Sequence, residues 1–328
     1  MAQLHTPVLT ASEPRQADRV AAGPAGDLAV DGICAGGPRE RVLQLGDGRL
    51  VRLSEYGATA GVPVIALHGT PGSRLKFRGA HETAVALGIR LIAPDRWGYG
   101  GSDAPARPGL AAYGDDLAAL ADALGIGRFG ILAVSGGGPF GAMAASLLGE
   151  RITGLALVCP VGPMAGNTPA GTSAFHRFCF NALPRIPGAV RLVFGSFSLV
   201  LRHAPDAAVR LATVRAAAAD RALMAGPPAR RQLAETFASG LARCSSGAVI
   251  DMTLFSRAWS ISDPVQARSR LWIGTEDRNV PLPAARQLAG RLGAEIVEKQ
   301  GCGHYWIGTQ WREILAWLAE PRQIASRD

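Results

Sequence analysis

The stretch AVSGGGPFG (residues 133–141) places a serine between an apolar run and three glycines. The apolar run predicts a buried strand, and the letters after the glycines predict a helix. Ser135 therefore lies at the carboxyl end of a strand and the amino end of a helix, where open parallel sheets bind their ligands. A nucleophile on such a sharp turn needs small side chains beside it, and Ala133, Gly136 and Gly137 meet that need.

A glycine-rich phosphate loop is the alternative interpretation of this stretch. A Walker loop would need Gly-Lys-Ser or Gly-Lys-Thr, and no lysine is present here. The motifs further along the chain favour the nucleophile over a phosphate site.

Strands and helices alternate over two parts of the chain, residues 39–160 and 260–322. The eight strand-like runs are RVLQL, RLVRLSEYG, PVIALHG, IRLIAPD, RFGILAVS, ITGLALVCP, SRLWIGTED and AEIVEKQ. The first two flank Gly46-Asp47-Gly48, which predicts an antiparallel hairpin. Strands that alternate with helices at this spacing build a parallel sheet with helices on both faces. We therefore expect an α/β fold with a mostly parallel eight-stranded sheet.

Two segments do not follow this alternation. Residues 161–259 contain helical stretches with Pro and Gly between them and no convincing strand, so we expect a helical cap inserted into the core. Residues 1–38 are rich in Ala, Gly, Pro and Asp without apolar periodicity, and we expect a flexible tail there.

Composition excludes several classes of protein. The 328 residues are 48% hydrophobic and 18% charged, which indicates a folded domain with an insertion. No run reaches the roughly 18 apolar residues of a membrane span, and the start lacks a signal-peptide pattern, so we expect a soluble cytoplasmic protein. The five cysteines include no CxxC pair, so neither a disulfide framework nor a metal site is expected.

Charge and motifs also limit the partners. The net charge is +8, but the basic residues are scattered singly and match no nucleic-acid motif. We therefore expect a small-molecule substrate, no nucleic acid and no cofactor, and the oligomeric state stays open.

A serine hydroxyl attacks when a base takes its proton, and an imidazole acts as that base when a carboxylate orients it. The stretch around Ser135 resembles the nucleophile turn of the α/β-hydrolase superfamily, with Ala133 where the usual first glycine stands. In that superfamily the chain order is serine, acid, histidine. The resemblance therefore implies Asp277, in GTEDRNVP, as the acid and His304, in GCGHYW, as the base.

Two other carboxylates compete for the role of the acid. Glu276 directly precedes Asp277, and Asp263 lies further upstream. Asp263 precedes Pro264, which is typical of a residue that begins a turn or a helix. GTEDRNVP (274–281) is similar to the family's loop after the penultimate strand, whose acid is the aspartate, and this favours Asp277.

The resemblance also implies an oxyanion hole, because the charge that develops on an attacked carbonyl needs two N–H donors. One donor is the backbone N–H of Gly136. The loop HGTPGSR (68–74) resembles the family's HG-x-P loop and assigns the second donor to Thr70. His68 is then expected to hold this loop rather than to catalyse.

The family carries out many reactions, so the fold alone does not identify the chemistry. A serine nucleophile disfavours dehalogenase and epoxide hydrolase reactions, which need an aspartate that forms an ester with an alkyl carbon. We expect a serine hydrolase that cleaves an ester-type bond through an acyl-enzyme. The alternatives are a proline-iminopeptidase-like aminopeptidase, suggested by HGTPG, a carbon–carbon bond hydrolase, and a ligand-binding module without activity.

The insertion bears on the substrate. Residues 161–240 contain nine arginines against three acidic residues. AVRLVFGSFSLVLRH (189–203) predicts a helix over an apolar pocket, and Phe175, Phe178 and Phe180 are expected to line that pocket. A partly apolar substrate is expected, and the basic rim would steer anionic ones. The plainer interpretation is that these arginines are solvated surface.

Overall fold

The structure is a computed structural model, and it describes residues 26–28, 38–165, 168–243, 245–261 and 264–320. Nine strands form one sheet in the order β1-β2-β3-β5-β4-β6-β7-β8-β9. Their bounds are β1 Gly26–Leu28, β2 Arg39–Gln44, β3 Leu50–Gly57, β4 Val62–Leu67, β5 Ile89–Pro94, β6 Phe129–Val134, β7 Ile152–Val158, β8 Arg268–Gly274 and β9 Glu295–Lys299. In this sheet order, each strand from β5 through β4 to β9 pairs parallel with the next. The pairs β1–β2, β2–β3 and β3–β5 are antiparallel. The predicted mostly parallel sheet is confirmed.

β1 is an addition to the eight predicted strands. Gly26–Leu28 pair with Val42–Gln44 of β2 at the edge of the sheet, inside the segment that was expected to be a tail. Three residues carry too little periodicity to predict a strand, and the open edge of β2 supplies the hydrogen bonds. The rest of the expected tail, apart from residue 38, lies outside the described residues.

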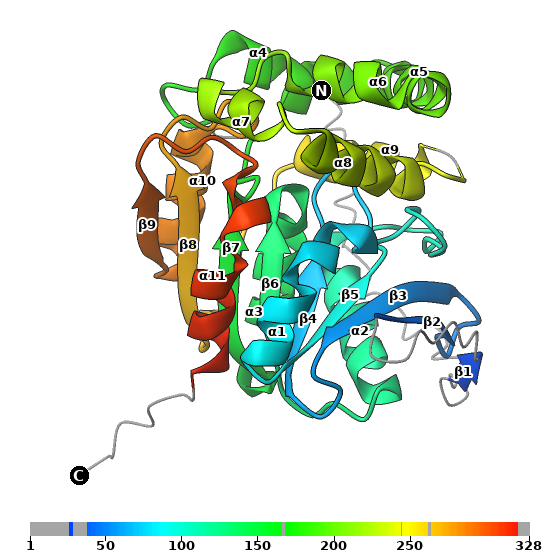
Figure 1. Cartoon of the computed structure of the whole chain (residues 1–328). Helices are drawn as coiled ribbons and strands as arrows, with labels where there is room; N and C mark the ends of the chain where they lie inside the picture. The colour runs from blue at the N-terminus through cyan, green and yellow to red at the C-terminus, as the bar shows by residue number, and fades with distance from the viewer. Residues whose placement is uncertain (1–25, 29–37, 166–167, 244, 262–263, 321–328) are drawn as a thin grey trace, which may run out of the picture.

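Helices cover both faces of the sheet (Figure 1). Their bounds are α1 His81–Ala86, α2 Leu110–Ala123, α3 Gly138–Leu148, α10 Leu282–Leu292 and α11 Trp311–Ala319. α1 packs with α11 on one face, and α2 packs with α3 on the other. The strands between them are apolar, and every residue of β6 is buried. This buried strand holds Ser135 at its carboxyl end.

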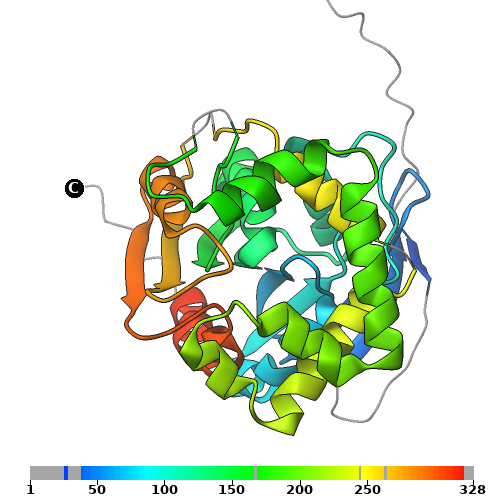
Figure 2. The same ribbon diagram turned by 90° about the horizontal axis from the view of Figure 1, so that it is seen from above.

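A layer of short helices, here called the helical layer, lies between β7 and β8 in the sequence. Its members are α4 Ala174–Arg177, a π turn at Phe178–Ala182, α5 Ala189–His203, α6 Pro205–Thr213, α7 Ala218–Leu223, α8 Pro227–Gly240 and α9 Ser246–Phe255. Figures 1 and 2 show this layer spread across one end of the sheet. It has a small apolar cluster of its own, which includes Leu201, Val209, Leu233 and Phe237.

Within the described ranges, the structure contains no helix with the length and apolar character that crossing a bilayer requires.

Candidate active site

Ser135 sits on a sharp turn between β6 and α3. Its backbone φ is +54°, in the left-handed region that residues with side chains rarely adopt. Such strain costs of order 1–3 kcal/mol and persists where the surroundings hold it. Here the N–H of Val161 donates to the carbonyl oxygen of Ser135 at 3.0 Å. The turn therefore presents the Ser135 side chain at the end of the sheet.

The glycines after Ser135 pack closely against other parts of the protein. A Cβ at Gly136 would overlap the side chain of Thr70, and one at Gly138 would lie 2.5 Å from Cβ of Pro160. With Gly141, these glycines also satisfy the spacing GxGxxG of a dinucleotide-binding turn, so the sequence alone does not exclude that motif. The space that the missing side chains leave is filled by protein atoms, which favours the nucleophile turn over a phosphate site.

Ala133 occupies the position of the expected glycine. An added Cβ at Gly141 would come within 2.7 Å of the Ala133 methyl group. Because Gly141 has no side chain, the Ala133 methyl group has space. Alanine in place of the family's usual glycine therefore causes no clash at this position.

Ser135, His304 and Asp277 form a continuous hydrogen-bonded line. Nε2 of His304 lies 3.1 Å from Oγ of Ser135, and Nδ1 of His304 lies 2.7 Å from Oδ2 of Asp277. Asp277 follows β8 and His304 follows β9, so both come from strand ends at the same edge of the sheet as Ser135. Asp277 and His304 are both buried. The structure thus brings the three predicted residues together.

The carboxylate of Asp277 is held in its ionised form. Burial would raise its pKa, but the His304 ring and the backbone N–H groups of Asn279 and Val280 outweigh that effect and keep the pKa below the usual value. The two N–H groups donate to Oδ1 at 2.8 and 3.1 Å, which leaves Oδ2 for the imidazole. Glu276, on the same loop, points outward and is exposed. Asp263, the other candidate acid, lies outside the described residues.

The two expected oxyanion donors lie beside the nucleophile. An added Cβ at Gly136 would lie 3.1 Å from the backbone nitrogen of Thr70, and one at Gly69 would lie 3.4 Å from Oγ of Ser135. The backbone N–H groups of Thr70 and Gly136 are therefore neighbours at the end of β4 and β6. Two adjacent N–H donors next to a hydroxyl suit an oxyanion.

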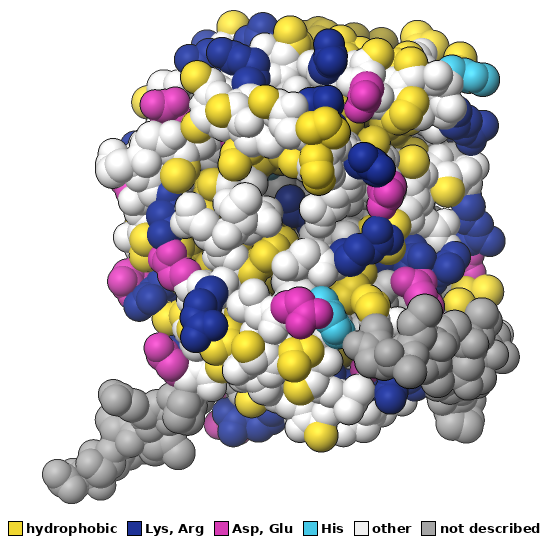
Figure 3. Space-filling model, viewed as in Figure 1, with side chains coloured by type: hydrophobic (Ala, Val, Ile, Leu, Met, Phe, Trp, Pro, Cys, Tyr) yellow, Lys and Arg dark blue, Asp and Glu magenta, His cyan; other side chains and the backbone are white. Residues whose placement is uncertain are grey.

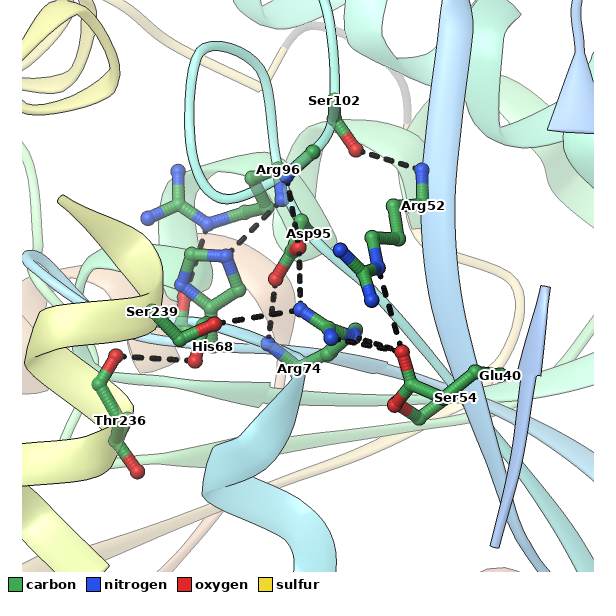
Figure 4. Close-up of polar contacts among 12 residues, drawn as sticks. Glu40, Arg52, Ser54, His68, Arg74, Asp95, Arg96, Ser102, Thr236 and Ser239 are labelled. Atoms are coloured by element: carbon green, nitrogen blue, oxygen red, sulfur yellow. Dashed lines mark hydrogen bonds and ion pairs between the residues drawn. The ribbon is translucent and has the colours of Figure 1, made fainter. Parts of the chain in front are cut away.

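His68 has a different environment from His304. Its Nε2 accepts the backbone N–H of Arg96 at 3.0 Å, so Nδ1 carries the ring proton and donates to the carbonyl oxygen of Gly69, 2.8 Å away. Burial, aided by the charge of Arg96, lowers the pKa of His68 well below its usual value. Figure 4 shows this imidazole between the loops after β4 and β5. His68 joins these loops, as the sequence interpretation expected.

A second buried contact fastens the same loops. Nη1 of Arg74 lies 2.9 Å from Oδ2 of Asp95, whose other oxygen accepts the backbone N–H of Arg74 at 2.8 Å. Arg74 also donates to Glu40 of β2 at 2.8 Å and to Ser239 of α8 at 3.3 Å (Figure 4). The loop that carries Thr70 is thereby tied to the sheet and to the helical layer.

Asp251 of α9 is a site residue that the sequence did not predict. Both of its oxygens accept hydrogen bonds from the guanidinium of Arg96, each at 2.7 Å. The hydroxyl groups of Tyr99 and Thr70 also donate to Asp251, that of Tyr99 at 2.7 Å. Asp251 and Arg96 are almost completely buried. The only sequence signal was a single carboxylate in the otherwise apolar stretch GAVIDMTLF.

Asp220 of α7 holds the histidine loop in a similar way. Its two oxygens accept the backbone N–H groups of His304 and Tyr305 at 2.7 and 2.8 Å. Gly303 lies so close that a Cβ there would overlap the carboxylate. Asp220 was counted as an acidic residue of the insertion, and nothing in its neighbouring letters indicates this contact. The helical layer therefore supports both the Thr70 loop and the His304 loop.

Replacing Asp251 with alanine is expected to lower the free energy of unfolding by about 3–5 kcal/mol, because the Arg96 charge would remain buried without its partner. The exposed carboxylate of Asp206, which lies 3.5 Å from Arg230, is the control, and Asp206→Ala should cost less than about 1 kcal/mol. Denaturant unfolding measures both. Equal stability of Asp251→Ala and wild type would contradict the role given to this ion pair.

One group of potential metal ligands lies within the described residues at this site. Ligand atoms of Cys159, Asp277 and His304 all lie within 4.8 Å of one another. Burial and the charge of Asp277 raise the pKa of the Cys159 thiol well above its usual value. Metal binding needs the thiolate, so this environment favours the hydrogen-bonded pair of Asp277 and His304 over a metal site.

A cavity of about 560 Å³ lies between the helical layer and the sheet, with Ser135 and His304 in its wall. Most of its lining is apolar, and its phenylalanines are Phe175, Phe180, Phe194, Phe197, Phe237 and Phe255. Phe178, expected in this lining, is not part of it, because it faces solvent from its turn and is 50% exposed. Among the described lining residues, the charged side chains are Lys76, Arg215 and Arg278, and none is an aspartate or glutamate.

Comparison with known proteins gives matches over most of the chain. A family model described as the alpha/beta hydrolase fold matches residues 62–308. The dihydrolipoyllysine-residue acetyltransferase component of the acetoin cleaving system of Pseudomonas putida is 30% identical over 272 residues, which are 81% of this chain and 69% of that protein. Juvenile hormone epoxide hydrolase of Bombyx mori is 51% identical over 57 residues, 16% of this chain and only 12% of that protein.

Solved structures show the same architecture. An alpha/beta hydrolase fold protein from Nakamurella multipartita has a TM-score of 0.63 and 26% identity, with 85% of this chain and 98% of that chain covered. Epoxide hydrolases and esterases also have this fold, at 16% to 20% identity, which shows the fold alone.

Proposed function

Because this chain belongs to the α/β hydrolase family, we propose that it is a serine hydrolase that cleaves an ester-type bond in a small, partly apolar substrate. The observation that carries the proposal is the line from Asp277 through His304 to Ser135, with separations of 2.7 and 3.1 Å. An imidazole oriented by a carboxylate and next to a hydroxyl is the arrangement that activates a serine nucleophile.

In the proposed reaction, Nε2 of His304 accepts the proton of Ser135 as Oγ attacks the carbonyl carbon of the substrate. The N–H groups of Thr70 and Gly136 stabilise the oxyanion that forms. When the carbonyl re-forms, the bond to the alcohol breaks, and His304 returns the proton to the leaving oxygen. Water then attacks the acyl-serine by the same steps and releases the acid.

Several observations weigh against the other reactions of the family. Epoxide hydrolysis through a covalent ester needs a carboxylate nucleophile, and this chain has a serine at that position. An aminopeptidase needs an acidic group for the substrate amine, and no carboxylate lies among the described residues of the cavity wall. We further propose that the helical layer is a cap domain, because it covers the cavity and supports both active-site loops through Asp220 and Asp251.

The proposal is tested by offering the purified protein p-nitrophenyl esters of short and medium acyl chains beside prolyl amides and 1,3-diketones, which are substrates for carbon–carbon cleavage. We expect the esters to be hydrolysed faster, and rapid acid quenching to trap an acyl group on the peptide that contains Ser135. Faster cleavage of prolyl amides would favour an aminopeptidase. Labelling of Ser135 by a fluorophosphonate without turnover of any ester would favour the ligand-binding module, and turnover of carbon–carbon substrates alone would favour that hydrolase class.

A further inference from the structure

Lys76 contributes a cation to the wall of the cavity that contains Ser135. It lies in a 3-10 helix, Arg74–Ala80, which follows the Thr70 loop directly. Its side chain is partly buried. Within the described part of the chain, no hydrogen-bond acceptor or carboxylate pairs with its ammonium group, whereas the neighbouring Arg74 and Arg78 both have carboxylate partners. Among the described residues, Lys76 is therefore a charged group without a hydrogen-bond or ion-pair partner.

Burial of this ammonium group costs free energy, and no hydrogen bond or ion pair from the described residues offsets that cost. Burial lowers the pKa of Lys76 to about 8, although the charge of Asp220 acts in the opposite direction. The described structure shows no hydrogen bond or ion pair between Asp220 and Lys76, and both oxygens of Asp220 accept backbone N–H groups of the histidine loop. An unpaired cation in a mostly apolar wall is the kind of group that a bound anion stabilises.

The other cations of the cavity lie at its rim. Arg215 and Arg278 are exposed, and the guanidinium of Arg215 sits over the ring of Phe175 at 4.0 Å. Arginines and hydrophobic side chains are interspersed over the helical layer (Figure 3). The chain uses lysine at two of its 34 basic positions, Lys76 and Lys299. Of the three cations among the described lining residues, the one that is partly buried is thus a lysine, a compact point charge on a flexible stem.

We propose that Lys76 binds an ionised carboxylate of the substrate, so that the preferred substrates are esters that carry a second, free acid group. This inference rests on the proposed serine hydrolase function. One ammonium group balances one negative charge, which suits a carboxylate better than a phosphate dianion. The apolar wall accommodates the hydrocarbon part that joins the carboxylate to the ester, and Arg215 and Arg278 attract the anion to the entrance.

The kinetic test compares the mono-p-nitrophenyl ester of a straight-chain dicarboxylic acid with the same ester whose free acid is capped as a methyl ester. Wild type should prefer the anionic ester. In Lys76→Met, the ratio of kcat/KM for the anionic ester to kcat/KM for the capped ester should fall by about tenfold to a hundredfold, because an ionic hydrogen bond is lost. Lys76→Arg should restore much of this ratio, because arginine can form the ionic hydrogen bond again. Lys299→Met is the matched control and should keep the wild-type ratio, since Lys299 pairs with Glu313 outside the cavity.

A second measurement does not depend on catalysis. Reductive methylation with formaldehyde marks lysine amines, and mass spectrometry separates the peptides of Lys76 and Lys299. A dicarboxylate should protect Lys76 but not Lys299, and neither the matched diamide nor inorganic phosphate should protect either lysine. Protection of Lys76 without hydrolysis of any ester would overturn the proposed function and keep the carboxylate site. Ester hydrolysis with an unchanged kcat/KM ratio in Lys76→Met, or protection only by a phosphate compound, would overturn the carboxylate site.

Discussion

Ser135→Ala is expected to abolish ester hydrolysis, with turnover falling on the order of a millionfold. The methyl group of alanine cannot attack a carbonyl, and the other groups of the site cannot form an acyl-enzyme in its place. The substrate should still bind, because the cavity wall and the N–H groups of Thr70 and Gly136 are unchanged. Steady-state kinetics with a p-nitrophenyl ester measures the loss, and thermal unfolding shows whether the variant folds.

The control for this variant is Ser269→Ala. Ser269 lies on β8, and among the described residues its hydroxyl donates to the carbonyl oxygen of Ala267 alone, so its removal should leave ester hydrolysis near the wild-type rate. A fluorophosphonate should label Ser135 in wild type and in Ser269→Ala, and should not label Ser135→Ala. Near-normal esterase activity in Ser135→Ala, or a fluorophosphonate adduct on another serine of the wild type, would refute the assignment of the nucleophile.

The residues at the strand ends could be predicted because the family resemblance implies their order along the chain and the topology brings the strand ends together. Ser135, Asp277 and His304 follow β6, β8 and β9, and the carboxyl ends of parallel strands meet at one edge of a sheet. A strand, a turn and a helix have local sequence signatures, and the resemblance to the α/β-hydrolase superfamily supplied the order serine, acid, histidine. No knowledge of side-chain packing was needed for this part of the site.

The contribution of the helical layer could not be predicted in the same way. Asp220 and Asp251 reach the active-site loops only because tertiary packing brings α7 and α9 next to these loops, and such packing leaves no local motif. Phe178 shows the same limit, because the π turn sends it to solvent while Phe180 stays in the cavity wall. The position of Lys76 likewise could not be predicted, because the cavity that it lines forms only where the helical layer packs over the sheet.

Acid is expected to weaken the protein partly through His68. Because the pKa of His68 is lowered in the folded state, the unfolded chain takes up a proton that the folded chain does not. The free energy of unfolding should therefore fall as pH drops below about 6.5, by up to about 1.4 kcal/mol per pH unit from this group. In a His68→Asn variant this contribution disappears, and unfolding should depend less on pH.

His304→Ala should lose turnover about as completely as Ser135→Ala does, because the proton of the Ser135 Oγ then has no acceptor. His68→Asn should not have this effect. Unlike His68, whose Nε2 accepts the N–H of Arg96, His304 directs Nε2 at Ser135. A His304→Ala variant that still turns over esters would exclude His304 as the base. A His68→Asn variant that loses turnover, yet keeps the wild-type stability and acid sensitivity, would show that the roles of the two histidines are reversed.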